Sequence, residues 1–154
     1  MTTEQEDALK LDRQLCFPLY ATARKITGAY TPYLKPLGLT YTQYIVFLVL
    51  WESAPMSVGE IGQRLHLDNG TLTPLLKKLE TAGYITRTRS TSDERIVTID
   101  LTDAGQEMRE KCAHIPAAME SLSCLQSEET QALYRLLYKL LAAEVPDAPY
   151  PQGS

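Results

Sequence analysis

Apolar residues along most of the chain recur at intervals of three and four, the spacing of amphipathic helices. The first stripe predicts a helix over about 7–30, in which Pro18 either kinks the helix or marks where its regular part begins. Residues 44–51 are apolar on every side and predict a buried central helix. That helix starts after Thr40, because Thr40 and Gln43 have the spacing of a capping box. Further helices are predicted over about 57–65, 69–82, 102–114 and 127–144.

Two segments in the middle of the chain have the alternation of strands instead. Residues 84–89 and 96–101 predict a β-hairpin whose polar tip is 90–95. Two short helices followed by a hairpin are typical of a winged helix-turn-helix. We therefore expect a mainly α fold, in which a winged helix-turn-helix with a small β-hairpin wing is joined to a helical dimerisation domain built from both termini.

This pattern divides the chain into four predicted parts. They are the N-terminal helices, which contain Cys16 and are expected to dimerise (1–52), the winged helix-turn-helix (53–102), the C-terminal dimerisation helices (103–145) and a loose tail (146–154). The apolar stripes of 7–30 and 115–145 otherwise lack a partner, so we expect them to form the dimer interface.

Composition and charge are those of an ordinary globular protein. Apolar residues make up 44% and charged residues 22% of the 154 residues. The formal net charge is −4, and residues 102–154 carry all of it, with four basic and eight acidic side chains. An acidic protein can still bind DNA if its cations are focused on one face. The longest apolar run, 44–51, is far shorter than the roughly 20 residues of a membrane span. No secretory signal is visible, so we expect a cytoplasmic protein with no membrane partner.

The helix predicted over 69–82 would enter the major groove, with its polar side chains and the cations of the hairpin contacting bases and phosphates. Arg87 and Arg89 share one face of their strand, and Arg95 at the hairpin tip could enter a minor groove. Asp68 or Asn69 can also cap the helix. The candidate DNA-binding residues from this part of the chain are Asp68, Asn69, Thr71, Thr73, Lys77, Lys78, Arg87, Arg89 and Arg95. The alternatives are ordinary surface charges and a winged helix used only for protein contacts.

The chain has three cysteines, too few and too irregularly spaced for a disulfide framework. Cys16 and Tyr20 are four residues apart on one helix face, where a phenol that donates to a thiolate would favour oxidation. The alternative is a small buried cysteine in a core helix. Cys112 shares a face with Met108 and is expected in the core, whereas Cys124 lies in a predicted connector. The two histidines have no ligand-spaced cysteines between them, so we expect no metal site and no cofactor.

The wing carries the first family resemblance. Asp93-Glu94-Arg95, followed by Ile99-Asp100-Leu101-Thr102 and Gly105, resembles the wing signature of the MarR family of bacterial regulators. The resemblance covers about residues 8–145. It implies a homodimeric winged-helix repressor that binds double-stranded operator DNA, in which Asp93 pairs with Arg95 and poises it for the minor groove.

A second set of residues resembles the organic-hydroperoxide-sensing branch of that family, the OhrR type. It comprises Gln14-Leu15-Cys16-Phe17, Tyr20, Tyr30, Leu39-Thr40-Tyr41, Gln43-Tyr44 and the segment 67–77. The resemblance implies that Cys16 is the redox-sensing cysteine and that Tyr20 and Tyr30 support its thiol. Members differ in whether a small-molecule thiol or a second cysteine resolves the oxidised residue, so Cys124 is a possible resolving residue, with an incidental thiol as the alternative. Asn69 departs from the family, where a smaller residue is common, which leaves the exact base contacts open.

Helix geometry adds an independent constraint on this site. Cys16 and Tyr30 are fourteen residues apart, which places them about 21 Å apart along a continuous helix. Tyr30 therefore cannot reach Cys16 of its own chain without a sharp break. It could reach Cys16 of a second chain whose first helix runs antiparallel, as two-fold symmetry allows. A site made of Cys16 and both tyrosines is thus predicted to be built across the dimer.

The sequence thus predicts a repressor, not an enzyme, whose reduced dimer is released from DNA when an organic hydroperoxide, as the inducer, oxidises Cys16. One alternative is a MarR-type repressor that responds to a small phenolic ligand, with Cys16 structural. A thiol peroxidase is a second, against which the chain shows no thioredoxin-like βαβ pattern around the cysteine. An adaptor that does not bind DNA is a third.

Overall fold

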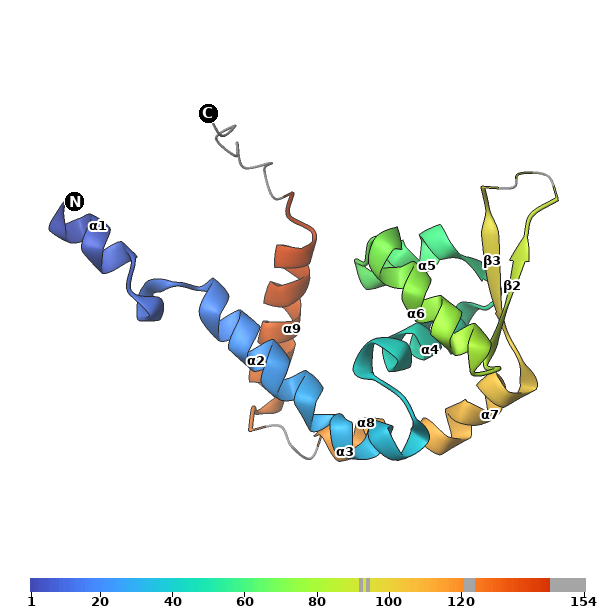
Figure 1. Ribbon diagram of the computed structural model, residues 1–154. Helices are drawn as coiled ribbons and strands as arrows, with labels where there is room; N and C mark the ends of the chain where they lie inside the picture. Colours follow the sequence, from blue (N-terminus) through green and yellow to red (C-terminus); the bar gives the residue numbers. More distant parts are fainter. Residues whose placement is uncertain (92, 94, 121–123, 145–154) are drawn as a thin grey trace. The chain divides into compact units, whose positions relative to one another are not determined.

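The computed structural model describes residues 1–91, 93, 95–120 and 124–144 (Figure 1). The described chain divides into two compact units, Met1–Met119 and Glu120–Ser154. The elements are α1 (Thr3–Ala8), η1 (Leu11–Arg13), α2 (Cys16–Ala29), α3 (Thr31–Leu34), η2 (Lys35–Leu37), α4 (Tyr41–Ser53), β1 (Met56–Ser57), α5 (Val58–Leu65), α6 (Asn69–Thr81), β2 (Ile85–Arg89), β3 (Val97–Leu101), α7 (Asp103–Cys112), α8 (Ile115–Glu120) and α9 (Ser127–Leu141). The predicted tail, 146–154, lies outside the described residues, and the four-part division stays a prediction.

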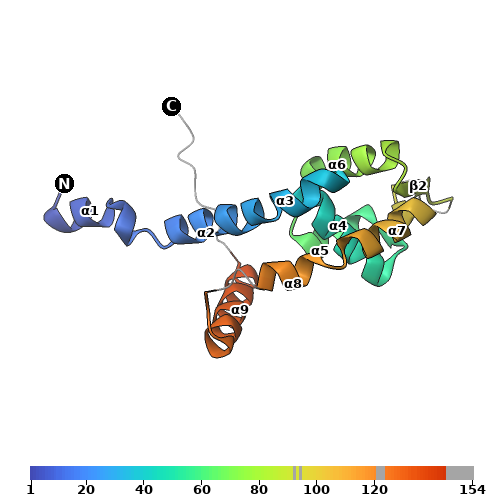
Figure 2. The same cartoon turned by 90° about the horizontal axis from the view of Figure 1, so that it is seen from below.

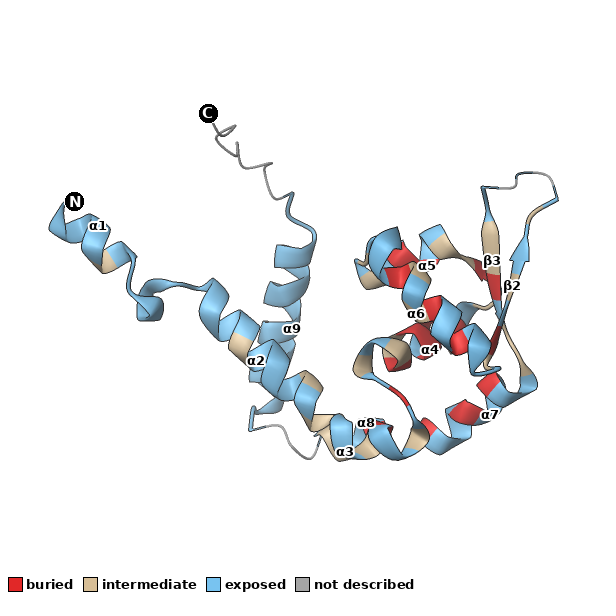
Figure 3. Ribbon diagram, viewed as in Figure 1, coloured by how far each residue is buried: buried red, intermediate tan, exposed pale blue. Residues whose placement is uncertain are grey.

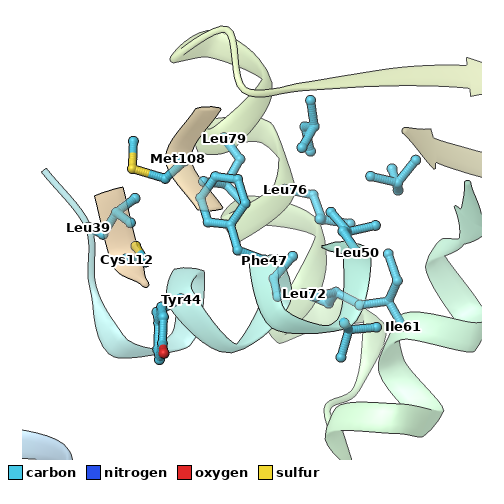
Figure 4. Close-up of a cluster of buried hydrophobic side chains, with 14 of the residues drawn as sticks. Leu39, Tyr44, Phe47, Leu50, Ile61, Leu72, Leu76, Leu79, Met108 and Cys112 are labelled. Atoms are coloured by element: carbon cyan, nitrogen blue, oxygen red, sulfur yellow. The ribbon is translucent and has the colours of Figure 1, made fainter. Parts of the chain in front are cut away.

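Helix α4 is the centre of the core in the first unit, because its sequence is apolar on nearly every side. Its side chain Phe47 is fully buried and lies among Leu76, Leu79 and Met108 of α6 and α7 (Figure 4). The buried residues of α4 are Tyr44, Val46, Phe47, Val49 and Leu50. The predicted buried central helix is confirmed, as is the mainly α winged helix-turn-helix.

Local capping bonds start three helices where the sequence predicted them. The Thr40 hydroxyl accepts from the Gln43 backbone N–H, and the Gln43 side chain accepts in return, so α4 begins with a full capping box. Ser57 and Glu60 make the same exchange at the start of α5. Thr102 caps α7.

The prediction of one helix over 7–30 is wrong in its first half. The chain forms α1 and the 3₁₀ turn η1 separately, and Gln14 between η1 and α2 is extended. Pro18 explains the break, because a helical proline clashes with the carbonyl of the residue four positions earlier, which is Gln14. In the first turn of α2 the missing N–H of Pro18 costs no helical hydrogen bond. Pro18 therefore marks where the regular helix begins, the second of the two expected outcomes.

The sheet has three antiparallel strands in the order β1-β3-β2. The predicted hairpin is confirmed, with Ile85 opposite Leu101 and Arg89 opposite Val97. The two-residue strand β1, which was not predicted, adds Met56 opposite Ile99 on the other edge of β3. The sheet thus ties the start of α5 to the base of the hairpin.

A tight turn joins α5 to α6. His66 ends α5 in the left-handed region, with φ of 52°, and the Leu67 N–H donates to the Gly62 carbonyl at 3.0 Å. A Cβ on Gly62 would lie 2.8 Å from the Leu67 carbonyl oxygen, so this turn needs a glycine there. Helix α6 continues through Pro74 and ends before Gly83, whose φ of 80° stops it as predicted.

Helices α1, α2 and α9 remain almost wholly exposed within this single chain, as Figure 3 shows. Helix α2 has no buried residue, although Figure 2 shows it following on from α3 almost in line. In the second unit α9 begins with Glu128 and Glu129 in its first turn, as expected, and also buries no residue.

Candidate DNA interface and thiol site

The N-terminus of α6 is held by its capping residue. Asp68 Oδ1 accepts the Thr71 backbone N–H at 2.8 Å, and Oδ2 accepts the Thr71 hydroxyl at 2.9 Å. The Thr71 backbone hydrogen bond is the main cause that holds the pKa of Asp68 below its usual value. The structure thus settles the capping question in favour of Asp68, whose carboxylate orients the first turn of α6.

The predicted DNA-contacting residues of α6 fall into two groups. Asn69, Thr71, Lys77 and Lys78 are exposed and available to a partner. Thr73 is half-buried, which corrects the expectation that it is exposed. It directly follows the fully buried Leu72 in the sequence.

The two arginines of β2 have different surroundings, although they point to the same face of the strand. Arg87 Nη1 pairs with Glu80 Oε2 of α6 at 3.6 Å, and the Arg87 side chain is only 20% exposed. Its Nε is buried and has no hydrogen-bond partner among the described residues. Arg89 is exposed near the tip. Arg89 is therefore accessible to DNA whereas Arg87 is largely covered, and the DNA-binding role of both arginines stays a prediction.

At the tip of the wing, Asp93 organises the turn. Its Oδ1 accepts the Arg95 backbone N–H at 3.0 Å, and its carbonyl accepts the Ile96 N–H at 2.9 Å. Arg95 is exposed. Asp93 and Arg95 are thus in contact, through the Arg95 backbone, while residues 92 and 94 lie outside the described part of the wing.

Glu80 is a site residue that the sequence analysis missed. It lies two positions after Lys78 in a run that looks like the solvated end of a helix. Only the packing of α6 against β2 brings Glu80 to Arg87, and no local spacing signals such a pair.

The candidate thiol site begins at the first residue of α2. Cys16 is exposed and opens a helix whose next turn carries Tyr20, so the two residues share one face as predicted. The Tyr20 hydroxyl accepts a hydrogen bond from Arg24 Nη1 at 3.2 Å. The Arg24 guanidinium also lies 5.6 Å from the centre of the Tyr20 ring.

Tyr30 lies at the opposite end of α2, where it caps that helix and precedes α3. Its ring packs on Tyr41 and Tyr44, with centroid distances of 4.9 and 5.8 Å. Burial, followed by the neighbouring Tyr30, raises the pKa of Tyr44 to about 12. Since α2 runs unbroken from Cys16 to Ala29, Cys16 and Tyr30 of one chain are separated by about 21 Å of helix.

The remaining cysteines differ in access. Cys112 is buried beside Leu39 and Tyr44 (Figure 4), and burial raises the pKa of its thiol. It belongs to the core, as predicted. Cys124 is exposed in the connector before α9. Of the three thiols, Cys16 and Cys124 are accessible to a reagent from solution.

Comparison with known proteins decides the family. A family model described as "Transcriptional regulator SarA/Rot" matches residues 29–112. An organic hydroperoxide resistance transcriptional regulator of Bacillus subtilis is 47% identical over 135 residues, which cover 88% of this chain and 92% of that protein. MarR of Escherichia coli is 26% identical with a TM-score of 0.64, covering 83% of this chain and 96% of that one.

The chain belongs to the MarR family of transcriptional regulators, in its organic hydroperoxide resistance branch.

AbfR of Staphylococcus epidermidis is another MarR-type structure similar to this chain. Reduced AbfR bound to DNA is 39% identical with a TM-score of 0.73, covering 89% of this chain and 96% of that one. The same protein has been solved overoxidised on DNA and in a disulfide-formed state. The relatives of this MarR-family chain are DNA-binding transcriptional regulators and not enzymes.

Exposed apolar side chains gather in two parts of the described chain. On α9 these residues recur at helical spacing, and a second set lies just before α2 and in its first two turns, close to Cys16 in the sequence. The α9 face comprises Leu133, Tyr134, Leu136, Leu137, Tyr138, Leu140 and Leu141, and the other face comprises Leu9, Leu11, Leu15, Phe17, Leu19 and Tyr20. Contiguous exposed apolar faces are typical of surfaces that pack against a partner.

No group of three or more His, Cys, Asp or Glu side chains is placed to hold a metal ion in the described part of the chain. Across residues 1–91, 93, 95–120 and 124–144, no helix is long and apolar enough to cross a membrane.

Proposed function

We propose that this transcriptional regulator is a homodimeric repressor, which holds operator DNA while Cys16 is reduced and releases it when an organic hydroperoxide oxidises Cys16. The observation that carries the proposal is the exposed Cys16 at the start of α2 with Tyr20 one turn away. It is supported by the 47% identity to an organic hydroperoxide resistance regulator.

The chemistry needs only the peroxide and a second thiol. The Cys16 thiolate attacks one peroxide oxygen, an S–O bond forms, the O–O bond breaks, and the alkoxide leaves as an alcohol after taking a proton. The resulting sulfenic acid condenses with another thiol to form a disulfide and water. Cys124 of the partner chain is the proposed second thiol, because it is exposed while Cys112 is buried. AbfR, solved on DNA when overoxidised and separately in a disulfide-formed state, supports a disulfide as the releasing product.

The DNA contacts are assigned to the exposed polar side chains of α6 and the wing. Asn69, Thr71 and the less accessible Thr73 are proposed to face base edges, and Lys77 and Lys78 to contact phosphates. Arg89 and Arg95 extend this surface along the wing, with Arg95 directed to a minor groove. Asp68, Asp93 and Arg87 act indirectly, because their side chains hold α6, the wing tip and the wing base in place.

The dimer is proposed to pair the exposed apolar faces of the N-terminal and C-terminal helices. If α2 helices run antiparallel across a two-fold axis, Tyr30 of one chain reaches Cys16 of the other. Tyr20 and the partner's Tyr30 then both donate to the thiolate, one from each side of the interface.

The test is operator binding by wild type and Cys16→Ser, with and without cumene hydroperoxide. We expect the peroxide to release wild type but not Cys16→Ser, because Cys16 is the proposed site of oxidation. Cys112→Ser should be released like wild type, because Cys112 is buried and shielded from the reagent. Release of Cys16→Ser by the peroxide would contradict the proposal.

A repressor that responds to a phenolic ligand is the second candidate. A cavity of about 350 Å³ is lined by Thr27, Lys35, Thr40 and Tyr41, among others, and offers hydroxyls and one cation to a small anion. Burial raises the pKa of Tyr41, so its phenol stays neutral and can donate. Release of thiol-blocked protein from the operator by salicylate would favour this candidate.

A further inference from the structure

One face of α2 carries three functional groups in a row. Cys16, Tyr20 and Arg24 are spaced four residues apart on a helix that runs unbroken from Cys16 to Ala29. Long side chains on a helix lean toward its N-terminus, so Arg24 leans toward Tyr20 and Tyr20 toward Cys16. Each of the two longer side chains therefore extends toward the preceding member of the row, and Cys16 is the first member.

Arg24 and Tyr20 interact in two ways, through a hydrogen bond and through a cation–π contact. Arg24 Nη1 donates to the Tyr20 hydroxyl oxygen at 3.2 Å, and the guanidinium lies 5.6 Å from the centre of the ring. None of the ion pairs among the described residues involves Arg24. Within residues 1–91, 93, 95–120 and 124–144, the Arg24 guanidinium thus interacts with Tyr20 and with no carboxylate.

The hydrogen-bond inventory of the two groups decides what Tyr20 can still do. A guanidinium has donors and no acceptor, so the Tyr20 oxygen must be the acceptor in this bond. The hydroxyl hydrogen of Tyr20 is then left for an acceptor elsewhere. Hydrogen bonds in a chain strengthen one another, so a phenol that accepts from a cation is a better donor.

We propose that Arg24 is a positioning residue for the reaction of Cys16: it holds the Tyr20 phenol so that its hydroxyl hydrogen is available to the Cys16 thiolate, and strengthens that donation. The inference rests on the proposed function and names a residue that supports its chemical step. Arg24 itself does not touch the sulfur or the peroxide. Its influence passes through Tyr20.

A double-mutant cycle on the full dimer tests this route. The rate constant of Cys16 with cumene hydroperoxide is measured for Arg24→Gln, Tyr20→Phe and the double variant, all in a Cys124→Ser background so that Cys16 is the accessible thiol. Lys25→Gln is the matched control, because it removes the same charge from the next position of α2.

We expect Arg24→Gln to slow the reaction about threefold, the size expected if a hydrogen bond to a charged group is strengthened by some tens of per cent. The pH–rate profile for alkylation by iodoacetamide should move to higher pH in Arg24→Gln and stay in place in Lys25→Gln. Arg24→Lys, which keeps a cation and an N–H donor, should restore most of the rate. In the Tyr20→Phe background, Arg24→Gln should have no further effect.

Three results would overturn the inference. One is an equal slowing by Arg24→Gln in the Tyr20→Phe background, which would mean that Arg24 acts without Tyr20. The others are an Arg24→Gln variant with the rate and pH profile of wild type, and a Tyr20→Phe variant that reacts as fast as wild type. The readout is modification of Cys16 itself. If the expected pattern appears while oxidised protein stays on the operator, the inference holds and the proposed function fails.

Discussion

Glu80 in the last turns of α6 and Arg87 in strand β2 form an ion pair of 3.6 Å between the recognition helix and the wing. The pair is asymmetric, because Arg87 is 20% exposed and Glu80 is 43% exposed. With Nε buried, Arg87 depends on Glu80 for the partner of its charge. This ion pair therefore adds a charged contact between the two proposed DNA-binding elements.

The two arginines of β2 should behave differently when replaced. We expect Arg87→Gln to lower the free energy of unfolding by about 1 kcal/mol, because a partly buried pair is lost. Arg89→Gln should leave stability unchanged and should reduce the slope of log affinity against log salt by about 1, since one phosphate contact is lost. Urea unfolding and operator titration at several salt concentrations measure both. A smaller salt slope for Arg87→Gln, with unchanged stability, would contradict the assignment.

Two glycines provide a second contrast. A Cβ on Gly105 would lie 2.2 Å from the Tyr84 carbonyl oxygen, and the Gly105 carbonyl is held by Trp51 Nε1 at 3.0 Å. Gly105→Ala should therefore cost about 3 kcal/mol, as overpacking does in rigid places. Gly59→Ala in α5 meets only Ser57 Oγ at 4.0 Å and should stabilise the protein by about 0.5–1 kcal/mol. Thermal unfolding followed by Trp51 fluorescence compares them, and equal effects would refute the packing argument.

The cap of α6 should make stability depend on acid. Hydrogen bonds from Thr71 hold the pKa of Asp68 below its usual 3.8, so the charged form is favoured by folding. This contribution is fully present above pH 3.8 and is lost as the pH falls through the lowered value. Asp68→Asn keeps a capping oxygen without titrating. The stability difference between wild type and Asp68→Asn should be constant at neutral pH and should change only below the usual value, as measured by urea unfolding.

The site across the dimer can be tested with mixed dimers. A dimer of one Cys16→Ser chain and one Tyr30→Phe chain keeps one Cys16 facing an intact Tyr30 of its partner. A dimer of wild type with the Cys16→Ser/Tyr30→Phe double variant keeps none. We expect the first dimer to react with cumene hydroperoxide faster than the second, because only it has the partner's phenol at the thiol. The opposite order would place Tyr30 in the same chain as the cysteine that it serves.

The resolving thiol has its own test. After peroxide, wild type and Cys112→Ser should form a disulfide between chains, and Cys124→Ser should not, since Cys124 is the exposed candidate. Non-reducing electrophoresis with mass spectrometry measures the product. An interchain disulfide in Cys124→Ser would exclude Cys124 from this role.

Features that depend on residues a few positions apart could be predicted from the sequence. The caps at Thr40, Ser57 and Thr102 could be predicted, because each capping bond joins residues three positions apart and this spacing is visible in the sequence. The buried α4 and the hairpin could be predicted from the spacing of their apolar residues, which requires burial whatever segment packs against them. The candidate cysteine and its tyrosines also came from the sequence, through residue spacing and family resemblance.

Contacts between distant segments were decided only by the tertiary structure. The Glu80–Arg87 pair joins α6 to β2, and β1 is two residues that become a strand only by pairing with β3. The half-burial of Thr73 and Arg87 likewise depends on which faces pack together. The break before α2 comes from a proline four residues after Gln14, a local cause for which the apolar stripe allowed two outcomes. Hydrogen bonds between residues a few positions apart, and the spacing of apolar residues, are determined by the sequence itself. The environment of a charged side chain is determined only when separate elements pack against it.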